Sequence, residues 1–378
     1  MTKRPPWRQI LKHNSDRYLS WLKENDIEYS SLDLLATQLS QFLIGCIQSE
    51  ADARKFWDVI PNVRAACNDP ATYELPFAAL AYAYVHLLQR YARTWVVLRH
   101  LTETYVLPLG DQGVRTLDIG TGPAPALYAI DDFYASLGEF AQSNKVPELT
   151  IPESRLDCIE NSKEMAHFIH HFSEFCHRRG PFGPTFADFS GIDFQSERDF
   201  HFRNFNYDTY WDEFTKQYEE WYDPQAASES ASRLFRFRFV VFSNFLTLGE
   251  TVEKFEVELQ KLFNDLHSGS VVIVLGGTGD SYIDVYERLS QIATGANMIF
   301  DSWDSDELGT LFEQRSAKCI KIAQHNVYEH LENLAGDPSL PKGKEWPDYW
   351  TPEPSALARN KFALRVFRYG RWPKATKR

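Results

Sequence analysis

The chain has 378 residues, and its 40 Lys and Arg against 52 Asp and Glu give a formal net charge of −12. This acidity disfavours nonspecific binding to nucleic acid, and the 5 cysteines, none spaced as C-x-x-C, argue against a disulfide framework or a structural metal centre. The N-terminus has no signal-peptide pattern, and no run of about eighteen apolar residues occurs. We therefore expect a soluble cytoplasmic protein that makes no membrane contact, with a large core and either an added segment or a second domain.

Residues 1–105 form the first predicted unit, an α-helical N-terminal segment. Apolar residues recur three and four apart in "DRYLSWLKEN", "SLDLLATQLSQFLIGCIQ" and "DARKFWDVIPNV". The last helical element, residues 76–107, is apolar on most sides, so it is expected to dock on the domain that follows. Tyr82, Tyr84 and Arg90 on this element could reach a ligand site, although core packing is the default expectation for them.

Residues 106–378 form the second predicted unit, because short apolar runs there alternate with helical patterns. This alternation predicts an α/β fold with a parallel sheet. A polar, Pro-rich insertion is expected at about residues 329–359, as a loop or lid. The predicted strands are "VRTLDIG", "RLDCIE", "FHFRNFNY", "FRFVVFSNF", "SVVIVLGG", "AKCIKIAQHN" and "KFALRVFRYG".

The stretch "TLDIGTGPAPALYAI", residues 116–130, combines a strand, a glycine turn and a helix start. Backbone N–H groups and a helix N-terminus then meet at one edge of the sheet, where they can accept a polar or anionic ligand. Pro123 lacks an N–H, and Ala124 takes the place of a third glycine, so binding of a pyrophosphate is weakened. A ligand with an amino-acid group needs less: N–H groups near its carboxylate and an acid, Asp118, near its ammonium group. The turn could instead be a purely structural connection.

The segment "LDIGTGP" resembles the first motif of the class I S-adenosylmethionine-dependent methyltransferases, a strand ending in an acid followed by a G-x-G turn. The resemblance implies a Rossmann-like seven-stranded sheet with helices on both faces, and S-adenosyl-L-methionine as the cofactor. The order G-T-G-P followed by a small residue is most similar to a branch related to mitochondrial ribosomal small-subunit assembly factors.

The resemblance also implies a set of cofactor-binding residues. Glu160, after the second strand, is placed to bind a ribose diol with its two oxygens, and either Asn206, which we prefer, or Asp208 is expected near the adenine. After the "FRFVVFSNF" strand, the site where the methyl group meets its acceptor would be lined by Ser243 and Asn244. The complete set is Asp118, Gly120, Thr121, Gly122, Glu160, Asn206, Ser243 and Asn244. Asp118 and Glu160 could instead be solvated strand ends.

The predicted function is transfer of a methyl group from S-adenosylmethionine to an unidentified nucleophile, in RNA, a protein or a small molecule. No catalytic base is named, because methyl transfer from a sulfonium requires positioning more than proton transfer. The alternative is a non-catalytic methyltransferase-like binding or assembly factor, for example on a ribosomal particle. His167 and His171 lie four apart, but no carboxylate stands between them as in H-E-x-x-H, so no metal is expected.

Overall fold

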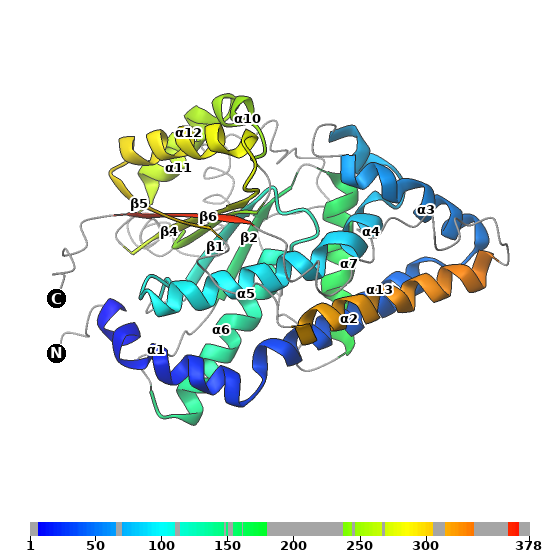
Figure 1. Ribbon diagram of the computed structural model, residues 1–378, viewed down its shortest axis with the longest axis horizontal. Helices are drawn as coiled ribbons and strands as arrows, with labels where there is room; N and C mark the ends of the chain where they lie inside the picture. Colours follow the sequence, from blue (N-terminus) through cyan, green and yellow to red (C-terminus); the bar gives the residue numbers. More distant parts are fainter. Residues whose placement is uncertain are drawn as a thin grey trace, which may run out of the picture.

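The computed structural model describes residues 7–65, 70–109, 114–146, 149, 154–160, 162–179, 237–243, 246–266, 269–304, 314–335 and 362–369. These residues form a mixed α/β structure with a six-stranded sheet and helices on both of its faces (Figure 1). None of the helices in these ranges combines the length and apolar character needed to cross a bilayer.

The N-terminal part is helical, as the apolar spacing predicts. In α2, Leu32, Leu35, Leu39 and Leu43 recur every three or four residues and are all buried, which is the pattern of a helix with one apolar face. The elements are α1 (Trp7–Glu24), α2 (Ile27–Cys46), α3 (Glu50–Ala65), η2 (Pro70–Glu74), α4 (Ala78–Tyr82), the π-helical turn η3 (Ala83–Leu87) and α5 (Leu88–Glu103).

The sheet is buried on both faces. In β3, Phe239 and Val241 belong to one hydrophobic core and Val240 and Phe242 to the other, because successive side chains of a strand point to opposite faces. Strands of this kind read as continuous apolar runs. The elements are β1 (Val114–Ile119), α6 (Pro125–Ser143), β2 (Ser154–Ile159), α7 (Lys163–Arg179), β3 (Phe239–Ser243), α10 (Gly249–Lys254), α11 (Glu256–Asp265), β4 (Val271–Gly276), α12 (Ser281–Gly295), β5 (Met298–Asp304), α13 (Gln314–Ala335) and β6 (Ala363–Tyr369).

The strand order is β2-β1-β3-β4-β6-β5, with β1 to β4 parallel and β6 antiparallel to both of its neighbours. The C-terminal ends of the four parallel strands therefore lie along one side of the sheet, which we call the carboxyl edge. Because β6 runs the other way, its first residue, Ala363, lies at this edge beside Gly276 of β4.

Two helical layers enclose the sheet (Figure 1). Helices α10, α11 and α12 pack on one face, and α5, α6 and α7 share the core of the other face with the N-terminal helices. Helix α13 lies alongside α2, so the C-terminal part of the chain returns to the N-terminal helices. The N-terminal segment is thus packed into the main core, as expected for its last element. The predicted boundary at residues 105 and 106 stays a prediction.

The C-terminal part differs from its prediction. Residues 317–326, predicted as a strand, lie inside α13, where Ala317, Ile320, Val327 and Leu331 are buried at helical spacing. Residues 329–335, predicted as the start of the insertion, are instead the end of the same helix, and the rest of the predicted insertion lies outside the described residues. Strand β5 was not predicted. The predicted strand "FHFRNFNY" lies outside the described residues, so five of the seven predicted strands are confirmed.

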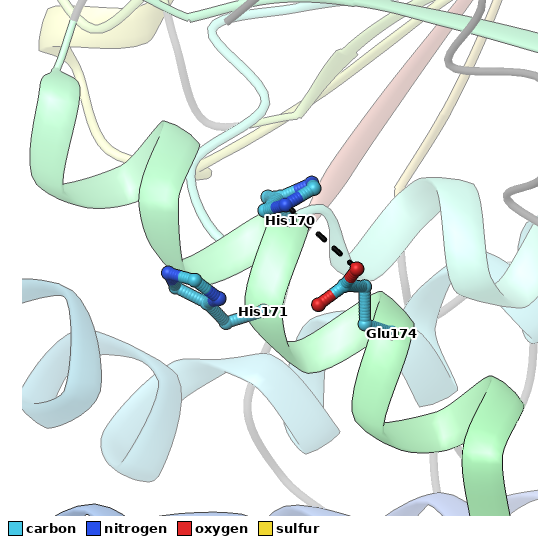
Figure 2. Close-up of side chains that lie close together, drawn as sticks. All are labelled: His170, His171 and Glu174. Carbon is cyan, nitrogen blue, oxygen red and sulfur yellow. Dashed lines mark ion pairs between the residues drawn. The ribbon is translucent and has the colours of Figure 1, made fainter. Parts of the chain in front are cut away.

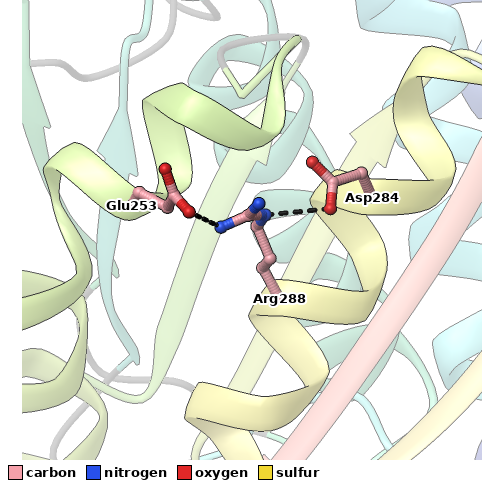
Figure 3. Close-up of polar contacts among 3 residues, drawn as sticks. All are labelled: Glu253, Asp284 and Arg288. Atoms are coloured by element: carbon pink, nitrogen blue, oxygen red, sulfur yellow. Dashed lines mark hydrogen bonds and ion pairs between the residues drawn. The ribbon is translucent and has the colours of Figure 1, made fainter.

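Helices α10 and α12 are joined at the surface by Arg288 (Figure 3). Its Nε donates to Asp284 Oδ1 at 2.9 Å, and its Nη1 donates to Glu253. All three side chains are substantially exposed, so this network orients the two helices without contributing much to stability.

Candidate functional site at the carboxyl edge

The sheet has its topological switch point between β1 and β3. From β1 the chain passes through α6 to β2 on one side, whereas β3 lies on the other side of β1. Loops that leave such neighbouring strands diverge, and ligands of open α/β sheets bind in the crevice they leave at the carboxyl ends. The glycine turn follows β1 here, and Ser243, buried at the end of β3, lies at the same edge.

The glycine turn has an unusual backbone. Gly120, Gly122 and Ala124 have φ values of 67°, 58° and 62°, all in the left-handed region. Glycine adopts this region without strain, but alanine there costs about 1–2 kcal/mol. Ala124, at the position where the sequence departs from a third glycine, therefore carries strain, and strained residues of this kind cluster at functional sites.

The turn is tied to the neighbouring strand through its own N–H groups. The N–H groups of Gly120 and Thr121 both donate to the Ile159 carbonyl, at 2.8 and 3.3 Å, and the Ala124 N–H donates to the Thr121 carbonyl at 3.1 Å. These donors are therefore used within the protein. The cradle of N–H groups predicted for a ligand carboxylate is smaller than the sequence suggests.

Glu160 closes the remaining gap between the turn and β2. Its Oε2 accepts the Gly122 N–H at 2.7 Å, and its Oε1 accepts the Ser162 N–H at 2.9 Å. A carboxylate offers about four acceptor positions, and each of these N–H groups takes one of them. The side chain is half-buried and so partly accessible. Glu160 thus holds the turn in place with a carboxylate of the kind that can accept hydroxyl groups.

Asp118 lies beneath the turn and is fully buried. The Thr121 hydroxyl donates to its Oδ2, while Oδ1 is enclosed without any hydrogen-bond partner. Burial raises the pKa of Asp118 to about 7, and the negative charge of Glu160 adds to this, whereas the Thr121 hydrogen bond and Arg90 oppose it. An enclosed, unpartnered carboxylate oxygen is costly for a fold. It is an acceptor suited to a cationic donor.

The N-terminal segment covers the glycine turn. Tyr82, at the end of α4, lies against it: its Cε1 is 3.5 Å from the position that a Cβ on Gly122 would occupy. Arg90 Nη1 donates to the Tyr82 hydroxyl, and the Arg90 guanidinium lies 4.9 Å from the Tyr82 ring centroid. The π-helical turn η3 follows Tyr82 directly, and such turns often occur at functional sites. Two of the three candidate residues on this element therefore reach the site.

Tyr84 does not reach the site. Its hydroxyl donates to the Gln324 carbonyl of α13 at 3.3 Å, and its ring packs edge-on against Phe56 at 5.8 Å. It is buried, and burial raises its pKa above the usual range. Core packing, the default expectation, holds for this residue.

The structure brings most of the predicted cofactor-binding residues together. The turn, Asp118 and Glu160 meet at the ends of β1 and β2, and Ser243 ends the next strand. Asn206 and Asn244 lie outside the described residues, so their roles stay predictions.

Further along the carboxyl edge, two tyrosines that the sequence did not single out cover the end of β4. The Tyr286 hydroxyl donates to the Gly277 carbonyl at 2.9 Å, and a Cβ on Gly276 would lie 2.7 Å from Tyr282 Cε1. Only glycine leaves room for these rings. The sequence signal for this aromatic packing was the pair of glycines in "LGGTGD", which was assigned only to the end of a predicted strand.

A histidine cluster lies on α7 (Figure 2). The possible ligand atoms of His170, His171 and Glu174 lie within 4.8 Å of one another, and His170 Nε2 is 4.0 Å from Glu174 Oε1. The two histidines are exposed, and the cluster offers three ligand atoms, fewer than the four of a structural zinc site. We assign no metal to this cluster.

A cavity of about 590 Å³ lies beside the cluster, between α2, α4 and α7. It shares no residue with the carboxyl-edge site and is mainly apolar. Its lining is Phe42, Cys46, Pro76, Phe77, Ala79, Leu80, Glu164, His167, Phe168, His171, Glu174 and Phe175.

Comparison with known proteins identifies a methyltransferase among the structural neighbours. No protein-family model matches the chain, and none of the curated proteins matches it. A solved structure of Haemonchus contortus phosphoethanolamine N-methyltransferase 2, in complex with phosphomonomethylethanolamine and S-adenosylhomocysteine, is similar at 12% identity and a TM-score of 0.32. The match covers 78% of this chain and 59% of that one, less than two thirds of the neighbour. At this similarity no site residue is transferred to the chain, and nothing supports the closer resemblance to mitochondrial ribosomal assembly factors.

Proposed function

We propose that the chain is an S-adenosylmethionine-dependent methyltransferase whose cofactor binds at the switch point between β1 and β3. One observation carries the proposal. At that point Glu160 is hydrogen-bonded to the glycine turn, and the buried Asp118 below it keeps one oxygen without a partner. A strand-to-helix connection that served packing alone would gain nothing from an unpartnered buried carboxylate.

The residues present fit this cofactor by their chemistry. Asp118 provides an acceptor for an ammonium group, and Glu160 provides a partly accessible carboxylate of the kind that binds a ribose diol. Thr121, Gly120 and Gly122 shape the turn between these two carboxylates. Ser243, followed by Asn244, is proposed to line the place where the acceptor meets the methyl group, and Asn206 is proposed near the adenine.

When bound, S-adenosylmethionine supplies a methyl group on a sulfonium centre. The task of the protein is to hold the acceptor in line with that group, because positioning alone can supply about 7–11 kcal/mol of the barrier. The packing of Tyr82 on Gly122 and its hydrogen bond with Arg90 keep the turn covered. This cover excludes water from the bound ligand and orients the turn. Neither role requires Tyr82 or Arg90 to transfer a proton.

One observation favours the second candidate function, a non-catalytic methyltransferase-like binding factor. The N–H groups of Gly120, Thr121 and Gly122 are all donated within the protein, and Pro123 has none. A turn of this kind is held rigid whether or not a ligand is present, as a purely structural role would require. Both functions allow cofactor binding, so only catalysis distinguishes them.

Transfer of labelled methyl groups from S-adenosylmethionine into a fractionated lysate tests the proposal. We expect label to enter one RNA, protein or small-molecule fraction with the wild-type chain and to be strongly reduced with Glu160→Gln. Binding of S-adenosylhomocysteine without any label transfer would support the non-catalytic function. The absence of both S-adenosylhomocysteine binding and label transfer would overturn the cofactor site itself.

A further inference from the structure

Arg93 has no carboxylate counterion among the residues that the structure describes. Its Nε is enclosed without a hydrogen-bond partner, and among the described residues neither Arg93 nor Arg90 forms an ion pair with a carboxylate. Arg54, Arg99, Arg288 and Arg315, by contrast, each lie within ion-pair distance of a carboxylate. The Arg93 side chain is partly buried, and burial of a guanidinium without an anion is costly, so its retention calls for an explanation.

The surroundings of Arg93 place it at the carboxyl edge. It lies on α5, with its guanidinium 5.7 Å from the ring centroid of Phe362, directly before β6, and it is close enough to Tyr282 of α12 to interact electrostatically. Helices α5 and α12 cover opposite faces of the sheet (Figure 1). Side chains from the two layers can meet only beyond the ends of the strands, so Arg93 lies past the end of β4, where Gly276 and Ala363 are paired.

Arg90 links this position to the cofactor turn. It interacts electrostatically with Asp118 on one side and with Arg93 on the other, and it donates to the Tyr82 hydroxyl over the turn. Burial, and then the positive charge of Arg90, lowers the pKa of Arg93 to about 10, so Arg93 stays charged at neutral pH. Two adjacent arginines, neither of which forms an ion pair with a carboxylate among the described residues, create a positive region inside an acidic protein.

We propose that Arg93, with Arg90 beside it, binds an oxyanion, a carboxylate or phosphate group, carried by the methyl acceptor. A guanidinium presents parallel N–H donors that match two oxygens of such a group. The position fits an acceptor rather than the cofactor, because Arg93 is at the β4 and β6 end of the edge, whereas Glu160 is at the β2 end. The acceptor role rests on the proposed function, but binding of the anion itself does not.

Thermal unfolding of the full chain with sodium phosphate or sodium acetate tests the inference, at constant ionic strength set with chloride so that screening does not change. We expect one of these anions to raise the unfolding midpoint of the wild type and of the control Arg54→Gln, whose exposed arginine lies on α3. In Arg93→Gln the apparent dissociation constant for that anion should rise at least about tenfold. Arg93→Lys keeps the positive charge but loses the parallel N–H donors of the guanidinium. Its apparent dissociation constant for the anion should lie between those of the wild type and Arg93→Gln.

The same samples separate a binding role from a structural one. Without added anion, Arg93→Gln should be at least as stable as the wild type, because it removes an unpaired charge. A clearly lower midpoint would show that Arg93 supports the fold and would overturn the proposal, as would the absence of any effect of both anions on the wild type. Calorimetry with S-adenosylhomocysteine on these samples tests the cofactor site separately: anion binding without cofactor binding would remove the acceptor role and leave the anion site.

Discussion

Two aspartates with raised pKa values, Asp118 and Asp132, show how the carboxyl edge differs from the helical core. Asp132, on α6, accepts a hydrogen bond from the Tyr91 hydroxyl of α5 at 2.5 Å, and burial raises its pKa to about 8. Burial also raises the pKa of Asp118, to about 7, but one of its oxygens has no partner. The first carboxyl group joins two helices. The unpartnered oxygen of the second carboxyl group destabilises the fold, and packing does not explain why it is kept. This is the reason for placing a ligand near it.

The largest expected effect is on stability and concerns Asp132. In Asp132→Ala the enclosed Tyr91 hydroxyl loses its acceptor, and we expect the free energy of unfolding to fall by about 2–3 kcal/mol. Urea denaturation measures this change. If Asp132 acts through Tyr91, the double variant with Tyr91→Phe should lose less than the sum of the two single variants. Full additivity would show that the hydrogen bond does not hold α5 and α6 together.

A second change should affect binding more than folding. Glu160→Gln replaces one acceptor oxygen by a donor, so one of the N–H groups of Gly122 and Ser162 faces an amide group that cannot accept it. We expect about a ten- to a hundredfold loss in cofactor affinity. The unfolding free energy should fall by about 1 kcal/mol, because the residue also ties the turn to β2. Loss of stability with unchanged affinity would make Glu160 purely structural.

The pH dependence of stability sharpens the comparison further. The pKa of Asp118 is about 7 in the folded chain and 3.8 in its ordinary state, so between these values the folded state binds a proton that the unfolded state does not. Stability from this group therefore falls as pH rises through that window and is constant above it. Relative to the wild type, Asp118→Asn should gain stability from pH 5 to pH 7 and no more above about pH 8. A relative stability independent of pH would show that Asp118 is not protonated in the fold.

Much of the fold was predictable because its signals are local. The buried runs of β1, β3 and β4 read as strands, and the glycines of the turn marked the connection to α6. Residues 317–326 were wrongly predicted as a strand because "CIKIA" is a short, mostly apolar run, which is compatible with either a strand or a helix. The helical spacing becomes clear only when Ala317 and Ile320 are read together with Val327 and Leu331, which all face one core.

The site was predictable only in part. Asp118 lies at the end of β1, the turn follows β1, and Glu160 follows β2. The parallel pairing of these two strands is therefore enough to bring the three together. The internal hydrogen bonds of the turn, and the roles of Arg93 and Tyr282, depend on how α5 and α12 cross the end of the sheet. The local sequence does not predict how these two helices are arranged, because the arrangement depends on tertiary packing.

Calorimetry with S-adenosylhomocysteine tests the central claim most directly, using the wild type, Asp118→Asn and the matched control Asp132→Asn. Both substitutions remove a carboxyl group with a raised pKa, but only Asp118 lies at the carboxyl edge. The account predicts saturable binding to the wild type and to Asp132→Asn, with at least about tenfold weaker binding to Asp118→Asn. Absence of binding to the wild type at millimolar ligand, or equal affinity in all three proteins, would contradict it.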